Sequence, residues 1–297
     1  MEHGTAKKDN YYLPEGLWQK GRNLIVVIGA VAWILSLIGA FIDKEQFFFS
    51  YTVAFWFLAV ISLGGLFWAM VQYVSGAAAS VTVRRIMENI AVGLPYAVLL
   101  FIPIALGLPY LYKWADPAVV AHDEVLSGRG LYFAPWFFLL RAFIYLAIWG
   151  FTAVRLYQHA TRLDDAQSIM ESIAQTRKAE RTSSIGLVLL FLTGTLAAWE
   201  WIMSLDARAF STIFGVYNLA NGALACIGVI TLIALLLRRN GVLENTITIE
   251  HYHDLGKWMF AITIFWAYAA FAQYMLIWYA NIPEETTYFQ PRVWGEW

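Results

Sequence analysis

The run LIVVIGAVAWILSLIGAF, residues 24–41, decides the fold class of this chain. It is apolar almost without interruption, whereas the strands of a membrane β-barrel alternate apolar and polar residues over about ten positions. A helix of about 20 mostly apolar residues crosses the hydrocarbon core of a bilayer. The run therefore predicts a transmembrane helix.

Six more stretches have the same character, so we predict an all-α integral membrane protein with about seven transmembrane helices. Gly64 and Gly65, in the second stretch, indicate close contact with another helix. Three prolines in the third stretch, at positions 95, 103 and 109, predict a bent helix. The predicted spans cover about residues 24–42, 51–75, 94–112, 131–154, 185–205, 214–237 and 258–280.

The composition of the whole chain agrees with a membrane protein and excludes several other classes. Of the 297 residues, 60% are hydrophobic and 14% are charged, against about 25% charged in a soluble domain. The net charge of −1 offers no basic face to nucleic acid. The single cysteine, Cys226, can form neither an internal disulfide nor a four-thiolate iron–sulfur site.

Lysine and arginine are distributed unequally between the two sides of the predicted membrane. Fourteen of them fall in the N-terminal segment and in the loops 76–93, 155–184 and 238–257, against five on the other side. Because cytoplasmic loops carry the excess of positive charge, we expect a cytoplasmic N-terminus. The loop 157–184 is rich in polar residues, and is either a solvated helical connector or a docking surface for a partner.

Two charged residues of opposite sign lie inside the predicted spans, Arg141 in the fourth and Glu200 in the fifth. A charge in hydrocarbon needs a partner or a function. At 1.5 Å per residue, Arg141 lies about 15 Å and Glu200 about 8 Å from the outer ends of their spans. A long arginine side chain covers that difference, so we predict that both face one polar interior.

Further polar residues fall in the same outer half of the membrane. They permit two interpretations: hydrogen bonds that hold helices together, or an outer half-channel and proton relay in which the buried Glu200 exchanges protons. The residues are Asp206, Asn218, Asn221 and Gln273.

A second polar group lies at the predicted inner ends of the spans. One interpretation is plain helix capping and interfacial anchoring. The other is an inner site of proton uptake built on His251, His253 and Asp254, because histidine titrates near physiological pH. An apolar middle separates this group from the outer one. Its members are Gln72, Tyr73, Arg84, Arg85, Glu88, His251, His253, Asp254 and Lys257.

The same residues argue against resident redox groups and metals. None of the five histidines falls inside a predicted span, so a bis-histidine haem is not expected. No predicted span contains the lysine that retinal requires. His251 and His253 alone are too few for a zinc site. We therefore predict no catalytic residue, no metal ligand and no covalently bound cofactor in this chain.

Several long motifs resemble the ActF-type membrane subunit of alternative complex III, a quinone-binding subunit of the NrfD-like family. The resemblance covers most of the chain. It is carried by the stretches VRRIME (83–88), WIMSLD (201–206), FSTIFGVY (210–217), HYHDLGK (251–257), FWAY (265–268), QY (273–274) and IWYANIPEET (277–286).

The resemblance implies a membrane subunit of a respiratory quinol:electron-acceptor oxidoreductase in a bacterial inner membrane. It implies as partners a sister NrfD-like subunit, iron–sulfur and haem c subunits, a terminal oxidase and membrane lipids. Menaquinone or ubiquinone is the implied ligand, bound here or in the sister subunit. A purely structural scaffold subunit and an independent secondary transporter remain as alternatives.

The resemblance also implies a division of the chain into bundles. Residues 1–23 form a cytoplasmic segment and 24–50 the first helix with an outer loop. Residues 51–210 form a four-helix bundle of spans two to five that includes the loop 157–184. Residues 211–297 are the start of a second, incomplete bundle, because the family has more spans than are found here.

Overall fold

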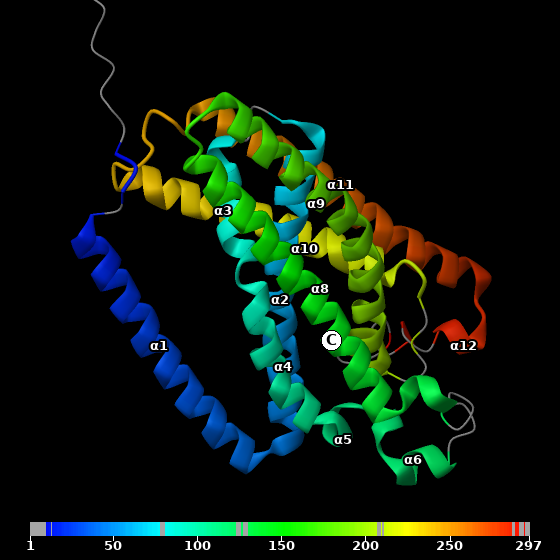
Figure 1. Ribbon diagram of the computed structural model, residues 1–297. Coiled ribbons are helices and arrows are strands. Elements are labelled where there is room, and N and C mark those ends of the chain that lie inside the picture. The colour runs from blue at the N-terminus through cyan, green and yellow to red at the C-terminus, as the bar shows by residue number, and fades with distance from the viewer. Residues whose placement is uncertain are drawn as a thin grey trace, which may run out of the picture.

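The computed structural model describes residues 10–12, 14–77, 81–122, 126, 130–206, 209, 211–286, 289–290 and 294. The fold in these ranges is helical, apart from an isolated bridge between Asn10 and Val242. Within them, seven helical segments are long and apolar enough to cross a membrane (Figure 1). The predicted class of an all-α multi-pass membrane protein is confirmed.

The long helices correspond to the predicted spans. They are α1 (Glu15–Ile42), α2 (Lys44–Ser75), α3 (Val81–Ala91) with α4 (Ala97–Leu106), α8 (Pro135–Asp164), α9 (Ile169–Ala197), α10 (Phe214–Arg239) and α11 (Ile249–Ala280). Shorter elements are η1 (Leu94–Tyr96), α5 (Leu108–Leu111), η2 (Lys113–Ala115), α6 (Pro117–His122), η3 (Gly130–Phe133), the π-helical turn η4 (Ala198–Ile202), η5 (Met203–Leu205) and α12 (Pro283–Thr286).

The third span begins earlier than the sequence predicts and also ends earlier. It runs from Val81 to Leu106, so the prediction that residues 81–91 belong to an inner loop is wrong. Helix α3 combines buried apolar residues with charged ones on the same short segment, and this mixture hides it from a search for apolar runs. Pro95 lies in η1 at the break between α3 and α4, and Pro109 falls in α5, beyond the span.

The predicted loop 157–184 is also mostly helix. Helix α8 continues to Asp164 and α9 begins at Ile169, so the connection is short. The Ser168 side chain caps α9 by accepting a hydrogen bond from the Glu171 N–H at 3.2 Å, as N-terminal caps commonly do. An apolar run identifies only the part of a helix that lies in the hydrocarbon of the membrane. Helices α8 and α9 extend beyond that part with polar residues, which the sequence places in a loop.

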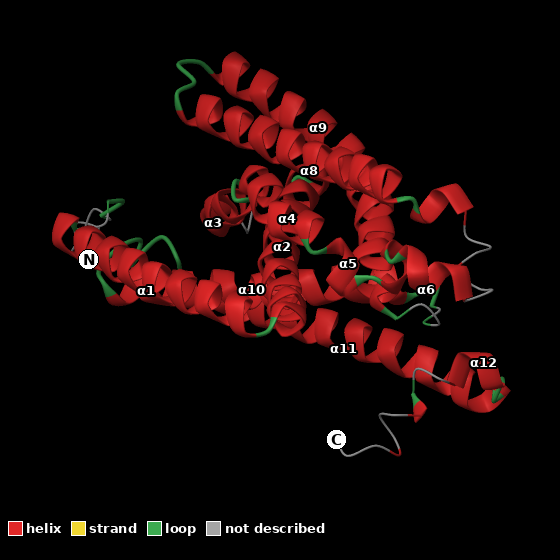
Figure 2. Ribbon diagram, turned by 90° about the horizontal axis from the view of Figure 1, so that it is seen from below, coloured by secondary structure: helices red, strands yellow, loops and turns green. Residues whose placement is uncertain are grey.

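Helix α2 lies at the centre of the bundle and contacts α3, α9 and α10, while α8 and α9 lie side by side (Figure 2). A Cβ atom at Gly64 would lie 2.2 Å from the carbonyl oxygen of Gly222 in α10. One at Gly222 would lie 2.5 Å from the carbonyl oxygen of Val60. The backbones of α2 and α10 therefore touch, which confirms the close packing predicted at Gly64.

Two long helices lie at the periphery. Helix α1 stands apart from the other helices in Figure 1 and contacts α2, which follows it in the chain. None of its described side chains is buried. Helix α11 buries only Leu255, Ala269 and Ile277 within the described structure. Because lipid is as apolar as these side chains, their exposure is compatible with a bilayer. The division into bundles at residue 210 stays a prediction.

Candidate functional site

The centre of the candidate site is the carboxylate of Glu200, whose side chain is only 2% exposed. Its Oε1 atom accepts hydrogen bonds from Arg141 Nε at 2.9 Å, the Tyr132 hydroxyl at 2.7 Å and the Tyr145 hydroxyl at 3.0 Å. The predicted encounter of Arg141 and Glu200 is confirmed as a buried ion pair. The two tyrosines complete a group that we call the Glu200 cluster: Tyr132, Arg141, Tyr145 and Glu200.

Three donors converge on one oxygen of the Glu200 carboxyl group, and hydrogen bonds of this charge-assisted kind are the strong ones. The other oxygen, Oε2, is buried without a hydrogen-bond partner in the described part of the chain. The same holds there for Nη1 of Arg141. The two oxygens of this carboxyl group therefore differ, with three donors on Oε1 and none on Oε2 among the described residues.

Arg141 is fixed in place by Tyr132 of η3 and by Phe137 at the start of α8. Its guanidinium lies 4.1 Å from the ring centre of Tyr132 and 4.4 Å from that of Phe137. Its Nη2 atom donates to the main-chain oxygen of Tyr132 at 2.9 Å. Cation–π contacts of this kind gain strength when they are removed from water. Tyr132 therefore positions both members of the ion pair.

Tyr132 connects the buried carboxylate to the surface. It lies in η3, outside the spanning helices, and 42% of it is exposed. Partial burial and the hydrogen bond to the negative Glu200 carboxylate raise the pKa of Tyr132 to about 12. The phenol therefore keeps its proton near neutral pH and acts as a donor to Glu200.

Glu200 is placed by the π-helical turn η4, which interrupts the end of α9. Such turns occur frequently at functional sites. Neighbouring side chains bond to carbonyl groups of this turn: the Tyr112 hydroxyl donates to the Trp201 oxygen at 2.9 Å, and the Ser204 hydroxyl donates to the Glu200 oxygen. Trp114 Nε1 in turn donates to Ser204 Oγ at 3.3 Å. The segment before α6 thus secures the turn.

An aromatic group lies next to the Glu200 cluster and separates it from the rest of the bundle. The Trp201 ring has five aromatic neighbours at centroid distances between 4.8 and 6.3 Å. This packing provides the apolar middle that the sequence predicts. The neighbours are Phe55, Trp56, Phe101, Tyr145 and Trp149.

The other outer residues lie in different surroundings from Glu200. Asp206 and Gln273 line a cavity of about 380 Å³ formed by η5, α10, α11 and adjoining residues. Asn218 accepts a hydrogen bond from Trp56 Nε1 at 3.0 Å and donates one to the Phe214 oxygen at 2.8 Å. Asn221 is half-buried on α10. For Asn218, the interpretation as a link between helices is confirmed.

The predicted inner group divides into two separate parts. In the first, the buried Glu88 accepts hydrogen bonds from the Tyr73 hydroxyl at 2.7 Å and from Arg85 Nη1 at 3.1 Å, one on each oxygen. Arg84 lies 3.6 Å from Oε1. Arg85 also pairs with Asp164 and thereby ties α3 to the end of α8. Both oxygens of Glu88 are occupied, which is typical of a structural role.

The second part lies at the start of α11. His251 Nδ1 accepts a hydrogen bond from the Thr248 N–H at 3.1 Å in a capping arrangement, which agrees with the capping interpretation for His251. Asp254 instead pairs with Lys257 at 3.1 Å. His251 and Asp254 line a cavity of about 380 Å³ between α2, α3, α10 and α11. His253 is exposed and does not line it.

Sequence reasoning missed the two tyrosines of the Glu200 cluster. Tyr145 lies four residues after Arg141, on the same face of α8, and this spacing could have identified it. Tyr132 precedes α8 in a short turn, and no periodic pattern connects it to Glu200. The π-helical turn that aims Glu200 at both hydroxyls has no recognised sequence signal.

Fold and site together define a multi-pass helical membrane protein with a buried carboxylate–guanidinium pair near one end of its bundle. No known protein family and no characterised protein matches this chain. The resemblance to the alternative complex III subunit therefore stays a prediction.

Proposed function

We propose that this protein is a membrane subunit of a respiratory quinol:electron-acceptor oxidoreductase of the alternative complex III type, in which the Glu200 cluster takes up and releases protons. The observation that carries the proposal is the Glu200 carboxylate itself. It is buried, accepts three hydrogen bonds at Oε1, and has no hydrogen-bond partner at Oε2 in the described part of the chain. A purely structural ion pair gains nothing from an unpaired buried oxygen, because such an atom is costly.

The route of the proton follows from the contacts of the cluster. The half-exposed Tyr132 bonds to Glu200, and Tyr145 bonds to the same oxygen from a buried position. The aromatic rings around Trp201 oppose passage of an ion toward the middle of the bundle, because a charge in such apolar surroundings is costly. Glu200 thus exchanges protons with the side on which Tyr132 is exposed.

Electron transfer in this proposal belongs to partner subunits. Menaquinol or ubiquinol supplies the electrons, and iron–sulfur and haem c subunits carry them. A sister NrfD-like subunit lies beside this chain. The proposed location is a bacterial inner membrane with the N-terminus in the cytoplasm. The asymmetric distribution of lysine and arginine supports this orientation.

The test is Glu200→Gln in the intact complex, reconstituted in sealed vesicles. Quinol oxidation and the accompanying pH change are measured together, and we expect proton movement to be lost while the complex still assembles. Glu88→Gln is the matched control, because it removes the other buried carboxylate and is expected to leave proton movement intact. Unchanged proton movement in Glu200→Gln would refute the proposed role.

A structural scaffold is the second candidate function. The observation that favours it is the Glu88 group, in which both carboxylate oxygens are paired and α2, α3 and α8 are joined. If neutral substitutions at Glu200 and Arg141 alter assembly alone, without changing proton movement in the assembled complex, the scaffold function is the better description.

A further inference from the structure

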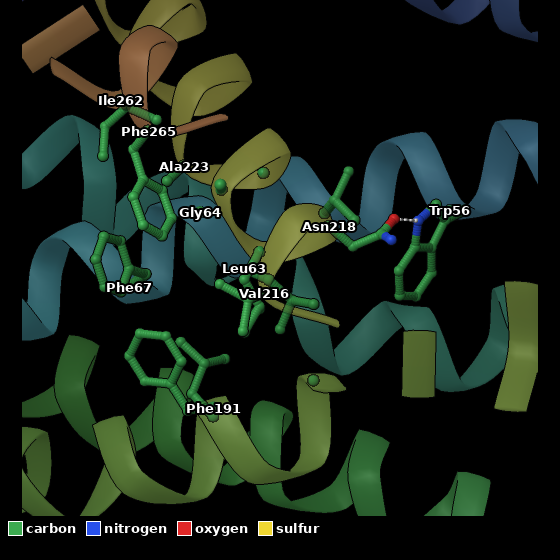
Figure 3. Close-up of a pocket in the computed structure, with 16 residues that line it drawn as sticks. Trp56, Leu63, Gly64, Phe67, Phe191, Val216, Asn218, Ala223, Ile262 and Phe265 are labelled. Atoms are coloured by element: carbon green, nitrogen blue, oxygen red, sulfur yellow. Dashed lines mark hydrogen bonds between the residues drawn. The ribbon is translucent and has the colours of Figure 1, made fainter. Parts of the chain in front are cut away.

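A cavity of about 130 Å³ lies between α9 and α11, above the crossing of α2 and α10. We call it the lateral cavity. Figure 3 shows Phe191 of α9 on one side, Ile262 and Phe265 of α11 on the other, and Leu63 and Val216 between them. Phe191 and Phe265 are each 44% exposed. The cavity thus lies beside side chains that face the surroundings of the bundle.

Three glycines, Gly64, Gly194 and Gly222, are among the residues that line the cavity. Gly64 and Gly222 bring the backbones of α2 and α10 into contact and contribute no side chain to the space above. Gly194 of α9 lines the same space. The gap is therefore built into the closest helix crossing of the bundle.

The lining of the lateral cavity is apolar. Its one polar side chain besides the Trp56 indole is Asn218, whose oxygen is bonded to Trp56 Nε1 and whose amide donates to the Phe214 oxygen (Figure 3). Both polar atoms of Asn218 thus already have a protein partner, and the rest of the lining offers little to hold water. Apolar cavities of about 150 Å³ stay dry and take up apolar molecules such as benzene or xenon.

Size and depth together select the occupant. A cavity of about 130 Å³ is too small for a helix about 10 Å wide, but it can take part of a flexible hydrocarbon chain. Leu63 and Ile262 lie near the middle of the spanning helices α2 and α11, where the surrounding medium is hydrocarbon. Phospholipid acyl chains fill that region at high concentration, which favours their binding by mass action.

We propose that the lateral cavity binds one acyl chain of a membrane phospholipid. The chain inserts between α9 and α11 and packs on the glycine floor. It contacts side chains of all four helices that line the cavity, so the bound lipid stabilises the position of the peripheral helix α11 against α2 and α10. This inference is independent of the proton transfer proposed for Glu200.

The experiment uses the full chain, extracted in detergent and examined by native mass spectrometry for bound phospholipid and by thermal unfolding with and without added phospholipid. We expect the wild type to retain one phospholipid and to gain thermal stability when phospholipid is added. Val216→Phe fills the cavity and is expected to lose both properties. Leu232→Phe is the matched control on the same helix, because Leu232 is 62% exposed and lies outside the cavity.

A second variant keeps the test decisive if Val216→Phe fails to fold. Ile262→Trp closes the cavity from the peripheral helix α11, where a larger side chain is tolerated more easily. Equal retention of phospholipid by the wild type and by the folded cavity variants would overturn the proposal. So would a wild type that retains a prenyl compound in place of phospholipid, or one that binds neither.

Discussion

Tyr132 is partly exposed and its hydroxyl bonds to the buried Glu200. Ionisation of Tyr132 therefore affects how the stability of the folded protein depends on pH. Its pKa is raised from the ordinary 10.0 to about 12 by partial burial and by the neighbouring carboxylate. Between about pH 10 and pH 12, Tyr132 keeps its proton in the folded protein but has lost it in the unfolded chain. Folding stability is then unaffected below about pH 10 and falls as the pH rises toward 12.

We predict that Tyr132→Phe removes part of this alkaline loss of stability. The measurement is thermal unfolding of the purified chain across pH 9 to 12, compared with the wild type. Tyr110→Phe is the control, because Tyr110 is also a partly exposed tyrosine but makes no contact with Glu200. An identical pH dependence in Tyr132→Phe and the wild type would contradict the contribution of Tyr132.

Arg141 supports a second prediction at the residue scale. Removing one partner of a buried ion pair leaves an uncompensated charge, which typically lowers the free energy of unfolding by about 3–5 kcal/mol. We expect a loss of that order for Arg141→Met, measured by denaturation in detergent. The double variant with Glu200→Met is expected to recover part of the loss. A single variant as stable as the wild type would show that the pair adds nothing to stability.

The sequence was informative about charges and poor about hydroxyl groups. Two charges of opposite sign inside apolar spans are strongly favoured to pair, because a single charge in hydrocarbon is costly. The ion pair of Arg141 and Glu200 was therefore predictable. Tyrosine is common at any membrane depth, and its hydroxyl carries no net charge that demands a partner. Tyr132 and Tyr145 therefore became visible only once the helices were in place.

At the scale of elements, the glycine contact between α2 and α10 makes the clearest prediction. A Cβ atom at Gly64 meets backbone, which cannot rotate away, at 2.2 Å. We expect Gly64→Ala to lower the free energy of unfolding by at least about 1–3 kcal/mol, the usual range for overpacking. Thermal unfolding measures the effect.

The matched control for this prediction is Gly228→Ala on α10, where an added Cβ atom meets nothing within 4 Å. Alanine is favoured over glycine inside a helix by about 0.5–1 kcal/mol, so this variant is expected to be neutral or stabilising. If both variants behave alike, the two backbones are not in contact at Gly64.

The sequence predicts the number of spanning helices correctly, but it predicts the residues at which they begin and end less well. Long apolar runs identify a spanning helix because each residue contributes independently to its transfer into lipid. Amphipathic α3 and the polar ends of α8 and α9 carry no such run, although hydrogen bonding makes them helical all the same. The π-helical turn at Glu200 is held in part by a tertiary contact, the hydrogen bond from the distant Tyr112 hydroxyl to the Trp201 oxygen, which a local sequence pattern does not contain.

At the scale of the whole molecule, stability is unevenly distributed over the seven spanning segments described. The core gathers around α2, where Leu66 is 1% exposed. Helix α1 buries none of its described side chains, and its Leu35 is 62% exposed. Mean hydropathy identifies both helices as spans and is higher for the peripheral one, 2.7 in α1 against 2.0 in α2. It cannot tell a central helix from a peripheral one, because lipid and protein interior are similarly apolar.

We therefore predict that the same substitution has a large effect on stability in α2 and almost none in α1. Leu66→Ala creates a cavity in the core and is expected to lower the free energy of unfolding by about 2–5 kcal/mol. Leu35→Ala is expected to change it by less than about 0.5 kcal/mol, as substitutions away from packed regions usually do. Thermal and denaturant unfolding of the purified chain provide the comparison. A loss at Leu35 as large as that at Leu66 would mean that α1 packs against protein in the folded molecule.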